Sequence, residues 1–228
     1  MMHTIQTVQP RPELKQFVRC FAHREMMLGE QSFDLPFIAS LEPILSFNFA
    51  DQEVMNYADG RGHLVSAFHV LGPQSHMTRS AHFSGRVIDF GIFLTSLAPW
   101  QLFGIPPSIL GDNDVAGDDL LGRAAGRLWA RLADAKSFAE RVCIAEQFLL
   151  PFALGHNKSS YISDSAAYLV RHSGSIRITE LANKCSLSLR QYERRFAGEL
   201  VLVRSVSHES PAFKWLLMQN AESQTVPE

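Results

Sequence analysis

Residues 178–196, ITELANKCSLSLRQYERRF, constrain the fold more than any other segment, because two short helical patterns follow each other with only two residues between them. The second pattern begins at Ser188, and Gln191 three residues later completes a capping box, which marks the start of a helix. Two helices of about two turns each, joined by so short a connection, form a helix-turn-helix. In the first pattern the apolar residues recur with the i, i+3, i+4 and i+7 spacing of one helix face, at Ile178, Leu181, Ala182 and Cys185.

The second pattern has one apolar face and one polar face. Tyr192 and Phe196 are four residues apart and stack on one side of the helix, which we expect to pack against Leu181 and Leu169. The second helix of a helix-turn-helix usually lies in the major groove of DNA. We therefore predict double-stranded DNA as the partner and a DNA-binding surface made of Ser188, Arg190, Gln191, Glu193, Arg194 and Arg195.

The side chains of this polar face have distinct expected roles. Arg190 and Arg194 contact bases or nearby phosphates, because an arginine fork pairs with guanine and a phosphate contact positions the protein. Glu193 biases base choice by accepting from cytosine, and Ser188 caps the helix. A basic helix with an aromatic stripe is also typical of an ordinary solvated helix face, so the DNA interpretation depends on the whole pattern.

The charge distribution along the chain favours a polyanionic partner. Residues 1–157 hold 12 Lys and Arg against 16 Asp and Glu, whereas residues 158–204 hold 8 against 4. A cationic segment attached to an anionic body indicates that the C-terminal part faces the polyanion.

The segment resembles the first helix-turn-helix of the AraC-type bacterial transcription regulators, whose common form is LA…S-x-R-x-L-x-R-x-F. The resemblance implies a sequence-specific DNA-binding transcription factor whose base-reading positions are Arg190, Glu193 and Arg194. Residues 70–110 and the helical patterns after them are similar to the sensor-type domain that precedes such motifs. The matching positions are Leu181, Ala182, Ser188, Arg190, Arg194 and Phe196, with Tyr192 where leucine is usual.

The family has two helix-turn-helix units, whereas only about 30 residues follow Phe196 here and no second reading helix is recognisable in them. We therefore expect a truncated regulator with one DNA-reading unit. The alternative interpretation is a stand-alone module that binds a small molecule or dimerises, with itself or with an intact paralogue, without productive DNA binding.

The first two-thirds of the chain mixes strand and helix patterns. Helical spacing occurs in PELKQFVRCF (12–21), APWQLFG (98–104), LLGRAAGRLWARLAD (120–134) and FAERVCIAEQFLLPFAL (138–154). Strand patterns occur in ILSFNF (44–49), HLVSAFHVLG (63–72) and GRVIDFGIFL (85–94). In the last of these, one face is wholly apolar and should point into a core, with Ile88, Phe90, Ile92 and Leu94.

These patterns predict an α+β protein with a strand-rich N-terminal sensor domain and an all-α, partial helix-turn-helix domain. We place a sensor or dimerisation domain at 1–154, a linker at 155–160 where GHNKSS is polar, the DNA-binding domain at 161–220 and a disordered tail at 221–228. The first helix of the DNA-binding domain is expected in ISDSAAYLVRH (162–172).

Composition excludes several other classes. No apolar run is long enough to span a bilayer, and the N-terminus lacks a secretory signal. The cysteines are odd in number and widely spaced, which is typical of reduced thiols in the cytoplasm. We therefore expect a cytoplasmic protein without a membrane partner, whose further partners are a small-molecule effector and a homodimer or paralogue partner. The cysteines are Cys20, Cys143 and Cys185.

Catalytic and metal sites are not indicated. No serine, cysteine or carboxylate pair forms a catalytic constellation, so we predict neither an enzyme nor a cofactor. The spacing of His63, His69, His76 and His82 does not match metal ligands, and GDNDVAGDD (111–119) is interpreted as a solvated turn and not a calcium loop. Arg86 and Asp89 are expected to form a structural ion pair, with a ligand pocket as the alternative.

Overall fold

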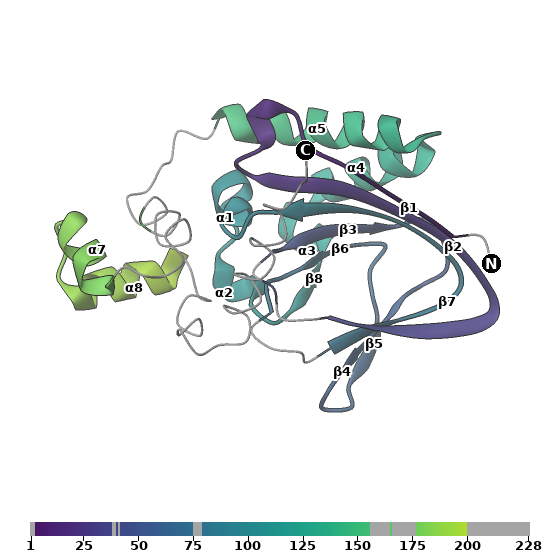
Figure 1. Cartoon of the computed structure of the whole chain (residues 1–228), viewed down its shortest axis with the longest axis horizontal. Coiled ribbons are helices and arrows are strands. Elements are labelled where there is room, and N and C mark those ends of the chain that lie inside the picture. Colours follow the sequence, from purple (N-terminus) through teal and green to yellow (C-terminus); the bar gives the residue numbers. More distant parts are fainter. Residues whose placement is uncertain are drawn as a thin grey trace, which may run out of the picture.

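The computed structural model describes residues 3–37, 40, 42–74, 79–155, 165 and 177–199, with the backbone alone at 3, 107–108 and 196–199. In this part of the chain an antiparallel sheet domain is followed by helices, so the predicted α+β class is confirmed (Figure 1). The strands are β1 (His3–Val8), β2 (Val18–Pro36), β3 (Ile44–Asn48), β4 (Val54–Tyr57), β5 (Gly62–Leu64), β6 (Phe68–Leu71), β7 (Arg79–Leu94) and β8 (Asp114–Ala116). The helices are the 3-10 helix η1 (Pro12–Leu14), α1 (Ala98–Phe103), α2 (Pro107–Leu110), α3 (Gly117–Leu121), α4 (Arg123–Asp134), α5 (Phe138–Gly155), α7 (Ile178–Lys184) and α8 (Leu189–Glu199).

Two long strands, β2 and β7, form the centre of the sheet. The hydrogen-bonded order is β1-β2-β7-β3-β6-β8, and the β4–β5 hairpin joins through β4 to β7. The last residues of β7 pair with β3, whereas its first residues pair with β4. Because both neighbours lie along one strand, β7 links the two halves of the sheet, and β2 and β7 curve together in Figure 1.

The two long strands become irregular where two glycines face each other. Gly29 of β2 pairs with Gly85 of β7, and the register shifts on both sides of Gly29. Both glycines have positive φ, 61° and 66° respectively. A Cβ atom on Gly85 would lie 2.2 Å from Asp51 Oδ2, so glycine is needed there for space as well as for backbone conformation.

Helices α4 and α5 cover one face of the sheet, and the main core lies between these helices and the sheet (Figure 1). From β7 the core takes Phe90, Ile92 and Leu94, none of which is exposed, so the predicted apolar strand face is confirmed for these three residues. The fourth predicted member, Ile88, is half-buried. From the helices it takes mainly the inward residues of α4 and α5, which are Ala125, Leu128, Leu132, Ile144, Ala145 and Leu149.

Two secondary-structure predictions for this domain are wrong. The segment 12–21 is not a helix but the short η1 followed by the start of β2, although its apolar residues Leu14, Phe17, Val18 and Phe21 are all buried. Strand pairing of β2 with β1 and β7 overrides the helical spacing. The segment 111–119 is not a solvated turn, because it holds strand β8 and the first residues of α3.

The helical predictions at 98–104, 120–134 and 138–154 are confirmed by α1, by α3 with α4, and by α5. In the described part of the chain, no helix is both long and apolar enough to cross a membrane. Residues 156–160 of the predicted linker, most of the predicted helix at 162–172, and residues 200–228 lie outside the described residues.

Candidate nucleic-acid interface and a cavity in the sheet

The predicted pair of helices is present, as α7 and α8, which pack against each other. Helix α7 begins after Arg177 and buries Leu181 and Ala182. Glu180 in its first turn and Lys184 in its last turn both have the charge that the helix dipole favours.

The connection between the helices is a Schellman motif. The Leu187 N–H donates to Ala182 O at 3.0 Å, and the Ser186 N–H donates to Asn183 O at 3.0 Å. Ser186 has φ 55°, the left-handed conformation in which glycine is usual. This motif turns the chain within two residues while satisfying the last carbonyl groups of α7.

Helix α8 begins with the predicted capping box. The Gln191 N–H donates to Ser188 Oγ at 3.3 Å, and the Ser188 N–H donates to Gln191 Oε1 at 3.2 Å. Both side chains are exposed at the N-terminal end of the helix.

The two faces of α8 separate as the pattern predicts. Tyr192 is 1% exposed, and its hydroxyl lies 2.7 Å from Ser165 Oγ, which is also buried. Burial raises the pKa of the Tyr192 phenol. The side chains of Phe196 and Leu169, which we also expected in this contact, lie outside the described residues. The predicted DNA-binding residues lie on the other face and are all exposed, namely Ser188, Arg190, Gln191, Glu193, Arg194 and Arg195.

A second candidate site is a hollow of about 220 Å³ on the sheet face opposite the α4–α5 core. The alternation of β7 places Asp89, Gly91 and Phe93 on this face, while Phe90 and Ile92 enter the core. Apolar and aromatic side chains provide most of its wall, namely Ile5, Leu35, Phe37, Ile44, Leu71, Phe83 and Phe93.

An ion pair lies in this hollow. Arg24 Nε is 3.1 Å from both carboxylate oxygens of Asp89, and the Arg24 Nη2 group also donates to Asp89. The guanidinium carbon lies 4.3 Å from the ring centroid of Phe83. The predicted pairing of Arg86 with Asp89 is therefore wrong: Arg86 pairs with Glu25 at 3.3 Å, because neighbouring positions on a strand point to opposite faces and Arg86 is three residues from Asp89.

Glu53 supplies a further carboxyl group to the hollow. It is 5% exposed, and burial together with the nearby Asp89 charge raises its pKa to about 7. Among the described residues its side chain has no hydrogen-bond partner, although Arg24 lies close enough to oppose part of the shift. The group is therefore divided between its neutral and charged forms near neutral pH.

A neighbouring hollow of about 320 Å³ shares Leu35, Phe37, Ile44, Leu71 and Phe93 with the first. Arg79, 3% exposed, lines it and donates from Nη2 to Gly72 O at 3.0 Å.

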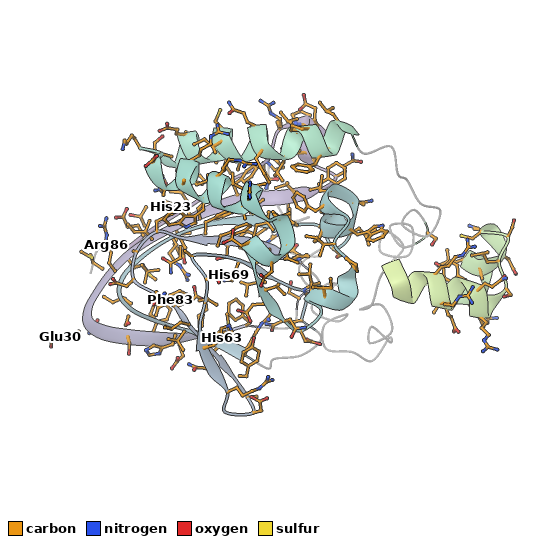
Figure 2. The ribbon with its side chains drawn as sticks, turned by 180° about the vertical axis from the view of Figure 1, so that it is seen from behind. His23, Glu30, His63, His69, Phe83 and Arg86 are labelled. Atoms are coloured by element: carbon orange, nitrogen blue, oxygen red, sulfur yellow. The ribbon has the colours of Figure 1, made fainter. Side chains whose placement is uncertain are left out.

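His69 and Phe83 lie within the sheet domain, whereas Glu30 lies at the outer bend of β2 (Figure 2). His69 Nδ1 is 3.0 Å from Ser66 O, while Nε2 is buried without a partner in the described part of the chain. Burial lowers the His69 pKa, so this ring is neutral near pH 7.

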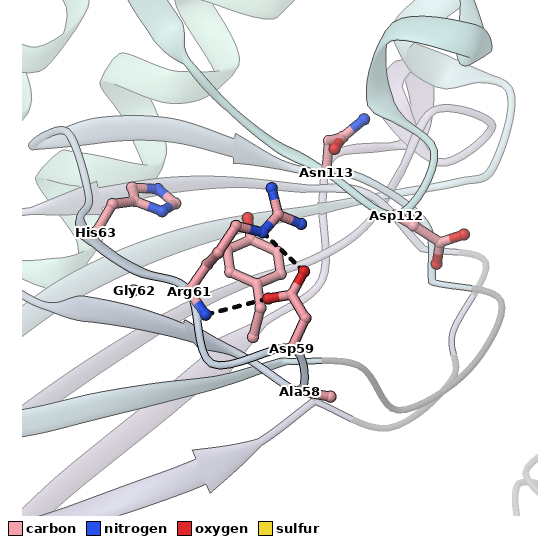
Figure 3. A pocket seen from close by; sticks show the side chains of 8 residues that line it. Ala58, Asp59, Arg61, Gly62, His63, Asp112 and Asn113 are labelled. Atoms are coloured by element: carbon pink, nitrogen blue, oxygen red, sulfur yellow. Dashed lines mark hydrogen bonds and ion pairs between the residues drawn. The ribbon is translucent and has the colours of Figure 1, made fainter.

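A larger hollow, of about 680 Å³, is an open surface depression beside the β4–β5 hairpin (Figure 3). Its charges are already paired, since Arg61 Nε lies 2.7 Å from Asp59 Oδ2 and His63 Nε2 lies 3.0 Å from Asp114 Oδ2. Asp114 also accepts from the Tyr57 hydroxyl, and burial raises the pKa of Tyr57 to about 12. A wide depression with matched charges is a weaker ligand site than the smaller hollow, whose wall is mostly apolar and aromatic.

Three of the four histidines considered in the sequence analysis have separate partners. His63 contacts Asp114, His69 contacts Ser66, and His82 Nδ1 lies 2.9 Å from Asp34 Oδ1. His76 lies outside the described residues.

No protein-family profile matches the sequence, and no curated protein matches it. The fold is similar to solved structures of AraC-like regulators over nearly the whole chain, at low identity. ToxT from Vibrio cholerae aligns at 9% identity and a TM-score of 0.44, covering 95% of this chain and 84% of that one. The AraC-like transcriptional activator CuxR aligns at 11% identity and a TM-score of 0.33, covering 93% and 90%. A cupin 2 domain-containing protein from Halorhodospira halophila aligns at 15% identity and a TM-score of 0.29, covering 41% and 64%.

The sequence predicts the helix pair but not the residues that line the hollow. It predicts an ion pair for Asp89, but with Arg86 and not with Arg24. No sequence pattern near Arg24 or Glu53 indicates a binding site. The pairing of β2 with β7 places Arg24 in the hollow, and the pairing of β4 with β7 places Glu53, which directly precedes β4. A search for charged residues on opposed strand faces could have found Arg24 opposite Asp89.

Proposed function

We propose that this protein is a cytoplasmic, sequence-specific DNA-binding transcription regulator of the AraC type. Residues 1–154 are the sensor part and residues 161–220 the DNA-binding part, joined by a linker at 155–160. The end of α5 at Gly155 supports the first boundary.

The observation that supports this function best is the division of α8 into two faces. Tyr192 is buried while Arg190, Glu193, Arg194 and Arg195 are exposed on the same helix. Such a helix, held by a two-residue turn against α7, presents a forked cation set of the kind that reads guanine and binds phosphate. Arg190 and Arg194 are the proposed base or phosphate contacts, and Glu193 the proposed discriminator.

In this function the sheet hollow receives a small-molecule effector, and a second copy or a paralogue supplies the other half of a DNA-bound assembly. The mostly apolar walls of the hollow, with a few charged groups among them, support the effector role. No catalytic role is proposed.

The experiment is enrichment of binding sites from random DNA duplexes, followed by titration of the enriched duplex at increasing salt. We expect log affinity to fall linearly with log salt concentration, by a slope that decreases by about one for each lost phosphate contact. Arg190→Ala or Arg194→Ala should weaken binding by about tenfold or more if the residue reads a base.

Arg127→Ala is the matched control, because Arg127 is an exposed arginine on α4. Equal loss in Arg127→Ala and Arg194→Ala, or no enrichment of any duplex at low salt, would contradict the DNA-binding role. The second outcome would leave the stand-alone sensor as the function, which the mostly apolar hollow favours.

A further inference from the structure

The smaller hollow is lined by two carboxyl groups, those of Asp89 and Glu53, and by one arginine, Arg24. Arg24 pairs with Asp89. Glu53 remains as a carboxyl group without a basic partner of its own. In the neighbouring hollow Arg19 pairs with Glu42 at 2.7 Å, and Arg79 donates to the Gly72 carbonyl oxygen.

The Glu53 carboxyl group is available to a ligand, because it takes part in no ion pair or hydrogen bond with a described residue. It lines the smaller hollow and is only 5% exposed. The charged groups that face it are Asp89 of β7, Arg24 of β2 and Asp114 of β8. Arg24 is already held on both oxygens of Asp89 and over the Phe83 ring, so it does not neutralise Glu53 as a dedicated partner.

The rest of the hollow suits a compact apolar body. Phe37, Phe83 and Phe93 supply aromatic walls, and Ile44 and Leu71 supply aliphatic ones. A volume of about 220 Å³ corresponds to about seven water molecules, which sets the size of a ligand near that of a single ring with a short substituent.

We propose that this hollow binds a small organic cation, a primary amine with an aromatic or short alkyl body, whose ammonium group donates to the Glu53 carboxylate. The inference rests on the proposed function only in naming this hollow as the effector site. It specifies the chemical class of the effector, because an anion would meet the surplus negative charge and a neutral ligand would leave Glu53 without an ionic partner.

Binding of such a cation must be coupled to the protonation of Glu53. With a pKa of about 7 in the free protein, Glu53 is about half protonated at pH 7. An ammonium group holds it in the charged form, so binding at pH 7 releases about half a proton. For the same reason amine affinity should rise about tenfold from pH 6 to pH 8, while the amine itself stays protonated.

The test is isothermal calorimetry of the full chain without DNA, using benzylamine, benzyl alcohol and benzoate as probes of equal shape and different charge. Titration in two buffers of different ionisation enthalpy measures the proton release. We expect benzylamine to bind at millimolar or lower concentration with proton release, and to bind more tightly than the alcohol and benzoate.

Glu53→Gln should reduce benzylamine affinity by about tenfold or more and abolish proton release, while leaving benzyl alcohol binding within about twofold. Glu30→Gln is the matched control, because Glu30 is exposed at the outer bend of β2. Preference for benzoate, unchanged benzylamine binding in Glu53→Gln, or no benzylamine binding would each overturn the proposal. DNA binding is measured separately, so failure here is distinct from failure of the regulator function.

Discussion

The hydroxyl of Tyr192 lies 2.7 Å from the hydroxyl of Ser165, and both side chains are buried although 27 positions separate them. This contact ties α8 to a residue that precedes α7. It orients the helix so that its arginines face outward, because the ring occupies the inner side of α8. The position of the candidate DNA-reading face therefore depends on one buried aromatic residue.

Removal of that hydroxyl should weaken the C-terminal unit. Tyr192→Phe keeps the ring and deletes the hydrogen bond, so we expect a loss of about 1 kcal/mol in the free energy of unfolding, measured by urea denaturation. Ser165→Ala should cost a similar amount, and the double variant should cost less than the sum of the two. Additive losses would show that the two hydroxyls do not interact.

Glycine at the left-handed position of the turn should stabilise the protein. Ser186 has φ 55°, so Ser186→Gly relieves backbone strain and should raise the free energy of unfolding by about 0.5–1 kcal/mol, net of the extra freedom of the unfolded chain. Ser188→Ala should have the opposite sign, a loss of about 1 kcal/mol, because Ser188 caps α8. Destabilisation by Ser186→Gly in thermal or urea unfolding would contradict the Schellman turn.

The paired glycines of β2 and β7 should respond unequally to alanine. Gly29→Ala introduces strain alone, since no atom lies within 4 Å of the added Cβ, and should cost about 1 kcal/mol. Gly85→Ala adds a clash with the Asp51 carboxylate, which accepts from the Arg86 N–H at 2.7 Å, and should cost about 2 kcal/mol more. Equal unfolding midpoints for the two variants would argue against this geometry.

Stability should depend on the ionisation of Glu53. Its pKa is raised from 4.5 to about 7 in the folded state, so the folded protein holds this proton more tightly than the unfolded chain. The stabilisation from protonated Glu53 is complete below pH 4.5 and is lost as pH rises to about 7, with a limit of about 3 kcal/mol.

Glu53→Gln lacks this proton equilibrium. The difference in unfolding free energy between Glu53→Gln and the parent protein should therefore grow in favour of glutamine from pH 5 to pH 8. A constant difference across that range, measured by urea denaturation at each pH, would show that Glu53 is not buried in its charged form.

The sequence was sufficient for features formed by neighbouring residues. The two-residue turn, the Ser188–Gln191 capping box and the two faces of α8 all follow from spacings within about 20 residues, and each is present in the structure. The helix prediction at 12–21 is wrong because the spacing of Phe17 and Phe21 fits one face of a helix and also fits buried positions at the start of a strand. Only pairing with β1 and β7 distinguishes the helix from the strand.

The candidate hollow could not be predicted because its members are distant in the chain. Arg24 and Asp89 meet across 65 positions, and Glu53 enters from the loop before β4. Nothing near Asp89 in sequence distinguishes Arg24 from Arg86 as its partner. The register of β2 on β7, with Arg24 directly opposite Asp89, decides it.

The sequence by itself determined the helix pair, its caps and the outward arginines, because helices and turns are stabilised by hydrogen bonds between residues a few positions apart. Only the tertiary structure decided which charges share the sheet hollow and which carboxyl group is left without a basic partner. The physical reason is that sheet pairing and burial act between distant segments, and burial, not residue type, sets the charge state of Glu53.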